Sequence, residues 1–115
     1  MRLLALDLGT KRTGVAFLDE EVGVPVALET IVHTSFAELQ ERVIDLITRK
    51  CVDRVIIGLP LLPSGALGEQ AELVHVFSRM ITERGYPVEL RDERYSTPRK
   101  PPSDAHSAAA LALLS

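Results

Sequence analysis

The stretch "RLLALDLGTKRTGVAFLD", residues 2–19, decides which fold this sequence can adopt. Its first half is an almost continuous apolar run that ends at Asp7 and Gly9, a pattern typical of a strand buried on both faces of a sheet. The short polar segment "GTKR" then leads into a second strand, "TGVAFLD". A third strand, "VPVALETIV", follows after "DEEVG", so the pattern predicts an antiparallel meander of hairpins.

The remainder of the chain alternates between helical and strand patterns. Ser35 and Glu38 form an S-x-x-E capping box at the start of a helix that runs to about Cys51, and "DRVIIGLPL" is a fourth strand. A second helix, "EQAELVHVFSRMITER", ends at Gly85 and is followed by the strand "YPVELRDE". We expect a last helix in "DAHSAAALALLS", with Ser103 as its cap.

The resulting order of elements is β-β-β-α-β-α-β-α. It predicts an α/β fold in which a mixed five-stranded sheet carries helices on both faces. A chain of 115 residues is long enough for one covered sheet, so we expect a single domain over residues 1–115. In such sheets functional groups gather beyond the carboxyl ends of the strands, which is where a site should be sought.

Composition and charge narrow the classes of function. The formal net charge of −3 removes the simple electrostatic argument for nucleic-acid binding, although a metal-dependent nuclease also gathers carboxylates in its site. Cys51 is the only cysteine, which excludes an internal disulfide and a multi-cysteine zinc site. No apolar run approaches the roughly 20 residues that span a bilayer, and the start lacks the pattern of a signal peptide. We therefore expect no membrane partner and a cytoplasmic location.

Acidic residues stand at the ends of two predicted strands and at the start of the last helix. Asp7 ends the first strand, Asp92 and Glu93 end the fifth, and Asp104 begins the helix. Clustered carboxylates repel one another unless a cation neutralises them, and oxygen ligands alone indicate Mg²⁺ or Mn²⁺. Taken singly, each acid also has a structural interpretation, as a turn former, a solvated strand end or a helix N-terminal charge.

Asp7 is the strongest of these candidates, because a charged residue is rare in a central strand without a partner or a metal. Between Asp92 and Glu93 the choice stays open: side chains alternate along a strand, so only one of the two faces a given side, and the sequence does not say which.

Glycines and basic residues follow Asp7 directly. Gly9 and Gly14 let the backbone approach a ligand, and Lys11 and Arg12 can meet phosphate oxygens. A D-x-G-T opening is also the phosphate-binding start of actin-like ATPases and sugar kinases.

The remaining metal-ligand residue types are better explained structurally. His33, His75 and Cys51 lack metal-ligand spacing, so we expect surface or core roles for them. His106 lies two residues after Asp104, and assistance in proton transfer is an alternative for it.

Four ordered motifs carry a resemblance to a known family: "LALDLGTKRTGVA", "VIIGLPLLPSGALGEQA", "DERYST" and a closing D-x-x-x-A-A. Together they resemble the YqgF/RuvX family of RNase H-like nucleases over essentially the whole chain. The resemblance implies an RNase H-like fold and a Mg²⁺- or Mn²⁺-dependent nuclease whose partner is RNA, branched DNA or both. Processing of the 5′ end of precursor 16S rRNA and resolution of Holliday junctions are the activities it implies.

The same resemblance implies roles for individual residues. The catalytic and metal-binding residues are Asp7, Glu93 and Asp104, with Asp92 in reserve for Glu93. The substrate-binding residues are Lys11, Arg12 and Arg94.

The sequence departs from the family pattern at residues 98–103, where only "PRKPPS" replaces a further helix and a basic loop. An extended chain of the ten intervening residues spans up to about 33 Å, so Glu93 and Asp104 can still reach one site. Arg99 and Lys100 then provide either a reduced substrate surface or a solubilising loop. The apolar run "SAAALALLS" must pack against the sheet or against another subunit, and a homodimer is the interpretation we favour.

Two other functions stay open from sequence. A non-catalytic RNase H-like module would bind nucleic acid without cutting it, although the presence of all three expected acids argues against this. An ATP- or sugar-phosphate-binding enzyme of the actin-like class is suggested by "DLGT" alone, but such enzymes close two lobes around a nucleotide and this chain has room for one.

Overall fold

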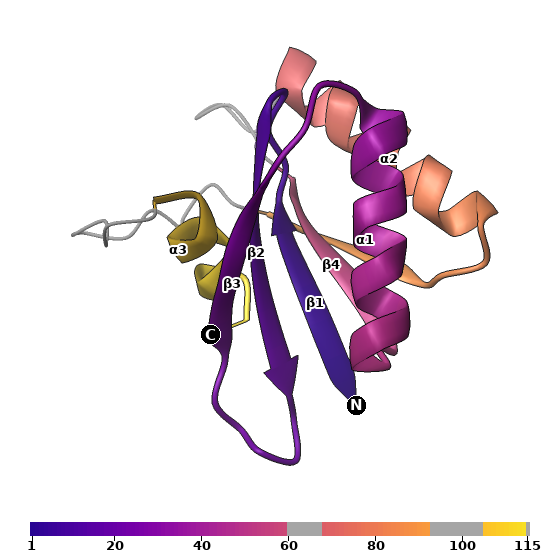
Figure 1. The fold of residues 1–115 in the computed structure, drawn as a ribbon. Helices are drawn as coiled ribbons and strands as arrows, with labels where there is room; N and C mark the ends of the chain where they lie inside the picture. The colour runs from indigo at the N-terminus through magenta and orange to yellow at the C-terminus, as the bar shows by residue number, and fades with distance from the viewer. Residues whose placement is uncertain (60–67, 93–104, 115) are drawn as a thin grey trace.

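The computed structural model of the protein describes residues 1–59, 68–92 and 105–114. Its elements follow the predicted order (Figure 1). They are β1 (Arg2–Asp7), β2 (Arg12–Asp19), β3 (Val26–Val32), α1 (Phe36–Lys50), β4 (Arg54–Leu59), α2 (Glu69–Glu83), β5 (Val88–Asp92) and α3 (Ala105–Ala112).

The five strands form one mixed sheet in the order β3-β2-β1-β4-β5. β2 pairs antiparallel with both β1 and β3, whereas β4 pairs parallel with both β1 and β5. Figure 1 shows α1 and α2 on one face of the sheet and α3 on the other. The predicted α/β architecture with helices on both faces is therefore confirmed.

Two hydrophobic clusters sandwich the sheet. Leu4 and Leu6 of β1 belong to the cluster under α1 and α2, whereas Leu3 and Ala5 belong to the cluster under α3. Alternate side chains of β1 are thus buried on opposite faces, which explains its continuous apolar sequence. It is the central strand of the sheet, and Asp7 is its last residue.

The first two helices begin and end where local chemistry predicts. The Ser35 hydroxyl accepts a hydrogen bond from the Glu38 amide at 3.2 Å, as predicted for the start of α1, and the Glu38 carboxylate accepts from the Thr34 amide instead of the Ser35 amide. Cys51 caps its other end in the left-handed conformation with φ 52° and is exposed. Gly85, with φ +95°, follows the last turn of α2 as predicted. Within the ranges that the structure describes, no helix is long and apolar enough to cross a membrane.

The apolar end of the chain packs on the sheet. Ala110, Leu113 and Leu114 are buried in the second cluster, and the Arg91 guanidinium of β5 donates a hydrogen bond to the Leu113 carbonyl. This packing accounts for the apolar run without a second subunit. The homodimer stays a prediction, and this run no longer supports it.

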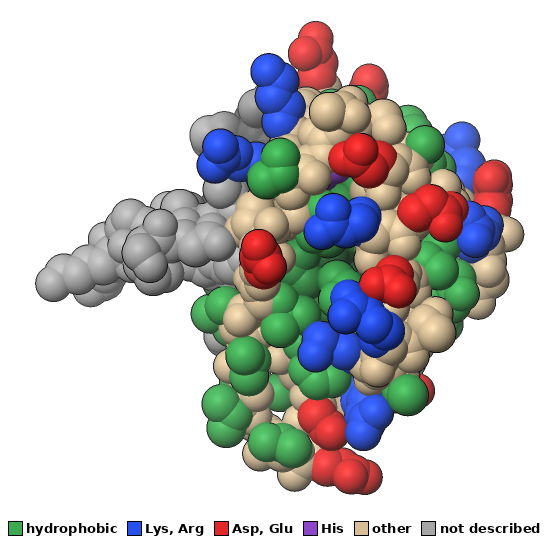
Figure 2. All heavy atoms as spheres, viewed as in Figure 1, with side chains coloured by type: hydrophobic (Ala, Val, Ile, Leu, Met, Phe, Trp, Pro, Cys, Tyr) green, Lys and Arg blue, Asp and Glu red, His purple; other side chains and the backbone are tan. Residues whose placement is uncertain are grey.

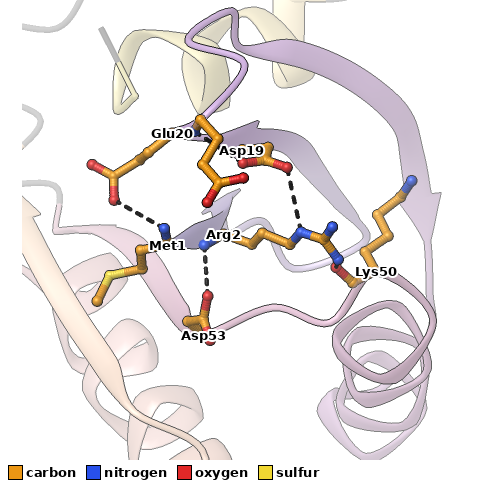
Figure 3. Close-up of polar contacts among 7 residues, drawn as sticks. Met1, Arg2, Asp19, Glu20, Lys50 and Asp53 are labelled. Carbon is orange, nitrogen blue, oxygen red and sulfur yellow. Dashed lines mark hydrogen bonds and ion pairs between the residues drawn. The ribbon is translucent and has the colours of Figure 1, made fainter.

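Polar contacts fasten the amino end of β1, as Figure 3 shows. The backbone amide of Arg2 donates a hydrogen bond to Asp53 Oδ2 at 2.7 Å. The Arg2 guanidinium forms an ion pair with Asp19 at 3.4 Å and donates a hydrogen bond to the Lys50 carbonyl at 3.3 Å. These contacts join β1 to the end of β2 and to the connection between α1 and β4. The amino terminus and Arg2 thus have the carboxylates of Glu20 and Asp19 as ion-pair partners at this end of the sheet.

Candidate functional site

Asp7 stands at the carboxyl end of the central strand, on the face that α3 covers. It is half-buried and follows Leu3 and Ala5 in the alternation along β1. Its pairing partner on β2 is Gly14, and on the other side Leu6 pairs with Ile57, which is directly followed by Gly58. The positions that flank Asp7 on the two neighbouring strands, about 4.8 Å away, are therefore both glycine and carry no side chain.

A tight loop links Asp7 to β2. A Cβ atom built on Gly9 would lie 2.1 Å from the Arg12 carbonyl oxygen, so only glycine fits this path. The Gln70 side-chain amide of α2 donates to the Leu8 carbonyl at 2.8 Å and braces the loop from outside. A hollow of about 360 Å³ lies at this place, and its lining residues are Gly9, Thr10, Lys11, Arg12 and Gln70.

Lys11 and Arg12 are the cations of this loop. Both are exposed, and no carboxylate among the described residues forms an ion pair with either of them. They stand a few residues beyond Asp7, at the hollow. Two exposed cations at one hollow suit the binding of an anion such as a phosphate.

Arg91 of β5 lies two strands from Asp7 in the sheet and pairs with Gly58 of the strand between them. Its guanidinium is already engaged by the Glu89 carboxylate and the Leu113 carbonyl. The hydrogen bond from Arg91 lowers the pKa of Glu89 against the opposing effect of burial, with help from the charges of Arg91 and Arg54. Arg91 therefore holds α3 on the sheet, whereas Lys11 and Arg12 have no ion-pair partner among the described residues.

A buried polar pair lies beneath the same loop. Thr13 Oγ1 and His33 Nε2 are 2.9 Å apart, and neither residue is more than 2% exposed. Burial lowers the pKa of His33, although the charge of Glu38 and the backbone of Ser35 raise it in part. The imidazole is therefore neutral at pH 7. Sequence reasoning assigned His33 a surface or core role and missed this pair, as it missed Gln70.

Most of the other predicted site residues lie outside the residues that the structure describes. Asp92 ends β5, and Glu93, Arg94 and Asp104 lie outside the described residues, as do Arg99, Lys100 and Ser103. Only the backbone of His106 is described, in α3. Within the described part of the chain no three His, Cys, Asp or Glu side chains lie close enough to hold a metal ion. The carboxylate cluster thus stays a prediction. Of its three proposed members, Asp7 is the one that the structure describes.

A second hollow, of about 160 Å³, lies between β3 and α1. Figure 2 shows basic and acidic side chains interspersed over this face. Arg49 pairs with Asp45 at 2.8 Å, and the Lys50 ammonium lies 5.2 Å from the centre of the Phe17 ring. The lining residues are Leu28, Glu29, Ile31, Arg42, Leu46, Arg49 and Lys50. Because two of its three cations have partners, this face is a weaker candidate for anion binding than the loop after Asp7.

Comparison with known proteins gives consistent matches. Residues 1–110 match the model of a family described as "RuvX: Holliday junction resolvase". A Moorella thermoacetica protein named "Putative pre-16S rRNA nuclease" is 39% identical over 98 residues, which cover 84% of this chain and 70% of that protein. A Synechocystis protein of the same name is 35% identical over 95 residues, which cover 82% of this chain and 62% of that protein.

The fold has a close counterpart among solved structures. Thermus thermophilus RuvC in complex with a Holliday junction substrate matches with a TM-score of 0.71 and covers 98% of this chain and 89% of its own. At 15% identity this likeness concerns the fold alone, and it confirms the predicted RNase H-like architecture.

Proposed function

The chain belongs to the RuvX family of Holliday junction resolvases, and from this premise we propose that it is a nuclease that hydrolyses phosphodiester bonds with the help of divalent metal ions. The observation that carries the proposal is the position of Asp7. Half-buried Asp7 ends the central strand opposite Gly14, and the exposed cations Lys11 and Arg12 follow four and five residues later. The chain spans only 62 to 70% of the length of the two relatives described above, so its own activity has to be measured.

We propose Asp7, Glu93 and Asp104 as the catalytic, metal-binding carboxylates. The alternation of β5 supports Glu93 over Asp92. Leu90 packs against the cluster under α1 and α2, whereas Arg91 reaches Leu113 on the α3 face, to which Asp7 also belongs. Continued beyond Asp92, the same alternation would give residue 93 the parity of Arg91, which supports the proposal of Glu93.

The donor chemistry fits Mg²⁺ or Mn²⁺, because all three proposed ligands are carboxylates. Such ions, when bound, activate the attacking water and stabilise the leaving oxygen. Asp7 holds its carboxylate at a fixed height above the sheet, since its backbone lies in the central strand. Lys11, Arg12 and Arg94 bind phosphates of the substrate and orient the scissile bond.

The substrate we propose is the 5′ leader of precursor 16S rRNA, a Holliday junction, or both. Either substrate implies a cytoplasmic protein. A four-way junction has two-fold symmetry, so paired cuts in it require a homodimer with two sites, whereas a single-stranded leader does not. A side-by-side cleavage assay on leader RNA, single-stranded RNA and a four-way DNA junction, each with Mn²⁺ or Mg²⁺, separates these substrates by the ratio of their rates.

The variant Asp7→Asn tests the site. It removes one charge without changing the shape of the side chain, and we expect cleavage to fall below detection while thermal unfolding stays cooperative. Asp53→Asn is the matched control, since it makes the same chemical change at the opposite end of β1, where Asp53 accepts from the Arg2 amide. Undiminished cleavage by Asp7→Asn would remove Asp7 from the mechanism. Binding of nucleic acid without cleavage by the unaltered protein would favour the non-catalytic module instead.

A further inference from the structure

The two buried polar side chains among the described residues contact each other below the loop that follows Asp7. Thr13 is fully buried and His33 is 2% exposed. Thr13 lies at the start of β2, and His33 directly follows β3. Apolar residues would fill both positions more simply, because a buried polar group contributes little stability even when it is paired. The pair is therefore a candidate for a role beyond packing.

The backbone of the loop is held by the Thr13 side chain and by the backbone amide of His33. The Gly9 amide donates to Thr13 Oγ1 at 3.5 Å, and the His33 amide donates to the Lys11 carbonyl at 2.9 Å. The Thr13 oxygen accepts from Gly9, so its own hydrogen can point to His33 Nε2. The loop is thus attached at two points, two and four residues beyond Asp7.

The pair is in turn anchored in the core. The His33 ring lies 6.4 Å from the Phe36 ring of α1, and Phe36 makes an edge contact with Phe77 of α2 at 5.5 Å between ring centroids. Phe77 is fully buried. A chain of packed rings therefore links the loop to the rigid part of the molecule, which explains how a short hydrogen-bonded pair can fix the position of a loop.

We infer that Thr13 and His33 are positioning residues that fix the Gly9–Arg12 loop, and through it the Asp7 carboxylate and the Lys11 and Arg12 cations, in the geometry that cleavage needs. This inference rests on the proposed nuclease function. Neither residue touches the substrate; both act through the backbone of the loop. A misplacement of about 1 Å at a catalytic group can lower a rate by about 100-fold.

Variants of Thr13 and His33 distinguish a positioning role from a purely structural one. Thr13→Val keeps the shape of the side chain and removes the hydroxyl, and Thr13→Ser keeps the hydroxyl and removes a methyl group. The double variant Thr13→Val with His33→Phe removes both polar side chains of the pair together, so neither is left buried without the other, and the Gly9 amide alone loses its acceptor. If the pair serves stability alone, activity will follow thermal stability across this set.

If the pair positions the loop, activity and stability will separate. Thr13→Ser should keep kcat within about threefold despite its lost methyl group, whereas Thr13→Val and the double variant should lose about 10- to 100-fold in kcat while unfolding cooperatively. Thr48→Val is the matched control, because the Thr48 hydroxyl bonds only the Ile44 carbonyl on the exposed side of α1. Its kcat should not change.

Amide hydrogen exchange gives a readout that does not depend on cleavage. Exchange in residues 9–12 should be faster in Thr13→Val and in the double variant, with exchange in α1 unchanged. Wild-type kcat and unchanged exchange in the double variant would overturn the inference. A protein that cuts no nucleic acid, yet shows the faster exchange in these variants, would refute the proposed function and leave the loop attachment intact.

Discussion

Replacing Gly9 by alanine should inactivate the protein without unfolding it. The new Cβ atom would lie 2.1 Å from the Arg12 carbonyl oxygen, whereas real Cβ contacts essentially never fall below 3.0 Å. The loop must therefore open by about 0.9 Å, which is the scale of overpacking that costs about 1–3 kcal/mol in the free energy of unfolding. The same shift moves the backbone two residues from Asp7, and we expect kcat to fall about 100-fold.

The matched control for this variant is Gly23→Ala. Gly23 adopts φ +83° in the turn between β2 and β3, at the opposite end of the sheet, and its Cβ would meet nothing within 4 Å. The left-handed backbone alone should cost about 1–2 kcal/mol, a loss similar to that of Gly9→Ala, with no change in kcat. Steady-state cleavage and urea unfolding measure the two quantities. Wild-type kcat in a folded Gly9→Ala protein would refute the link between loop geometry and catalysis.

Two further predictions concern stability. Ser35→Ala removes the hydroxyl that accepts from the Glu38 amide and should lower the free energy of unfolding by about 1 kcal/mol in urea titrations, whereas Ser78→Ala inside α2 should not lower it. Burial lowers the pKa of His33, so below its ordinary value of 6.5 the unfolded chain takes up a proton before the folded one. This contribution to stability is fully present above pH 6.5 and is lost as the pH falls through the lowered folded pKa. Thermal unfolding of wild type should show this loss, and a protein with His33→Phe and Thr13→Val should not.

The order of the elements could be predicted from the sequence because each boundary has a local chemical signal. Ser35 and Glu38 mark the start of α1, and Gly85 marks the end of α2. The change from a two-residue to a helical period separates β3 from α1. Such signals lie within a few residues of each boundary, so they predict the boundary even when the pairing of the strands is unknown. Strand ends shifted by one or two residues, as for β3, which begins at Val26.

The candidate site could be predicted only in part. Asp7 was identifiable because a charge in a central strand is rare, and the structure places it there. The choice between Asp92 and Glu93 depends on which cluster Leu90 joins, and that is a property of the sheet. The contact between Thr13 and His33 depends on the pairing of β2 with β3, whose register shifts between Thr13 and Val15. No sequence pattern within β2 or β3 predicts such a shift in their register.

The packing of α3 has a consequence for the order in which the molecule is completed. The meander of β1, β2 and β3 needs contacts that are close in sequence, so it can form early, whereas α3 docks on β2 and β3 across most of the chain length. Until Leu113 and Leu114 are in place, the face that carries Asp7 lacks two of the seven buried residues of its cluster. A chain emerging from the ribosome would therefore hold Asp7 in a sheet with one bare face until residues 105–114 have been added, and we expect the proposed cleavage to begin only after that.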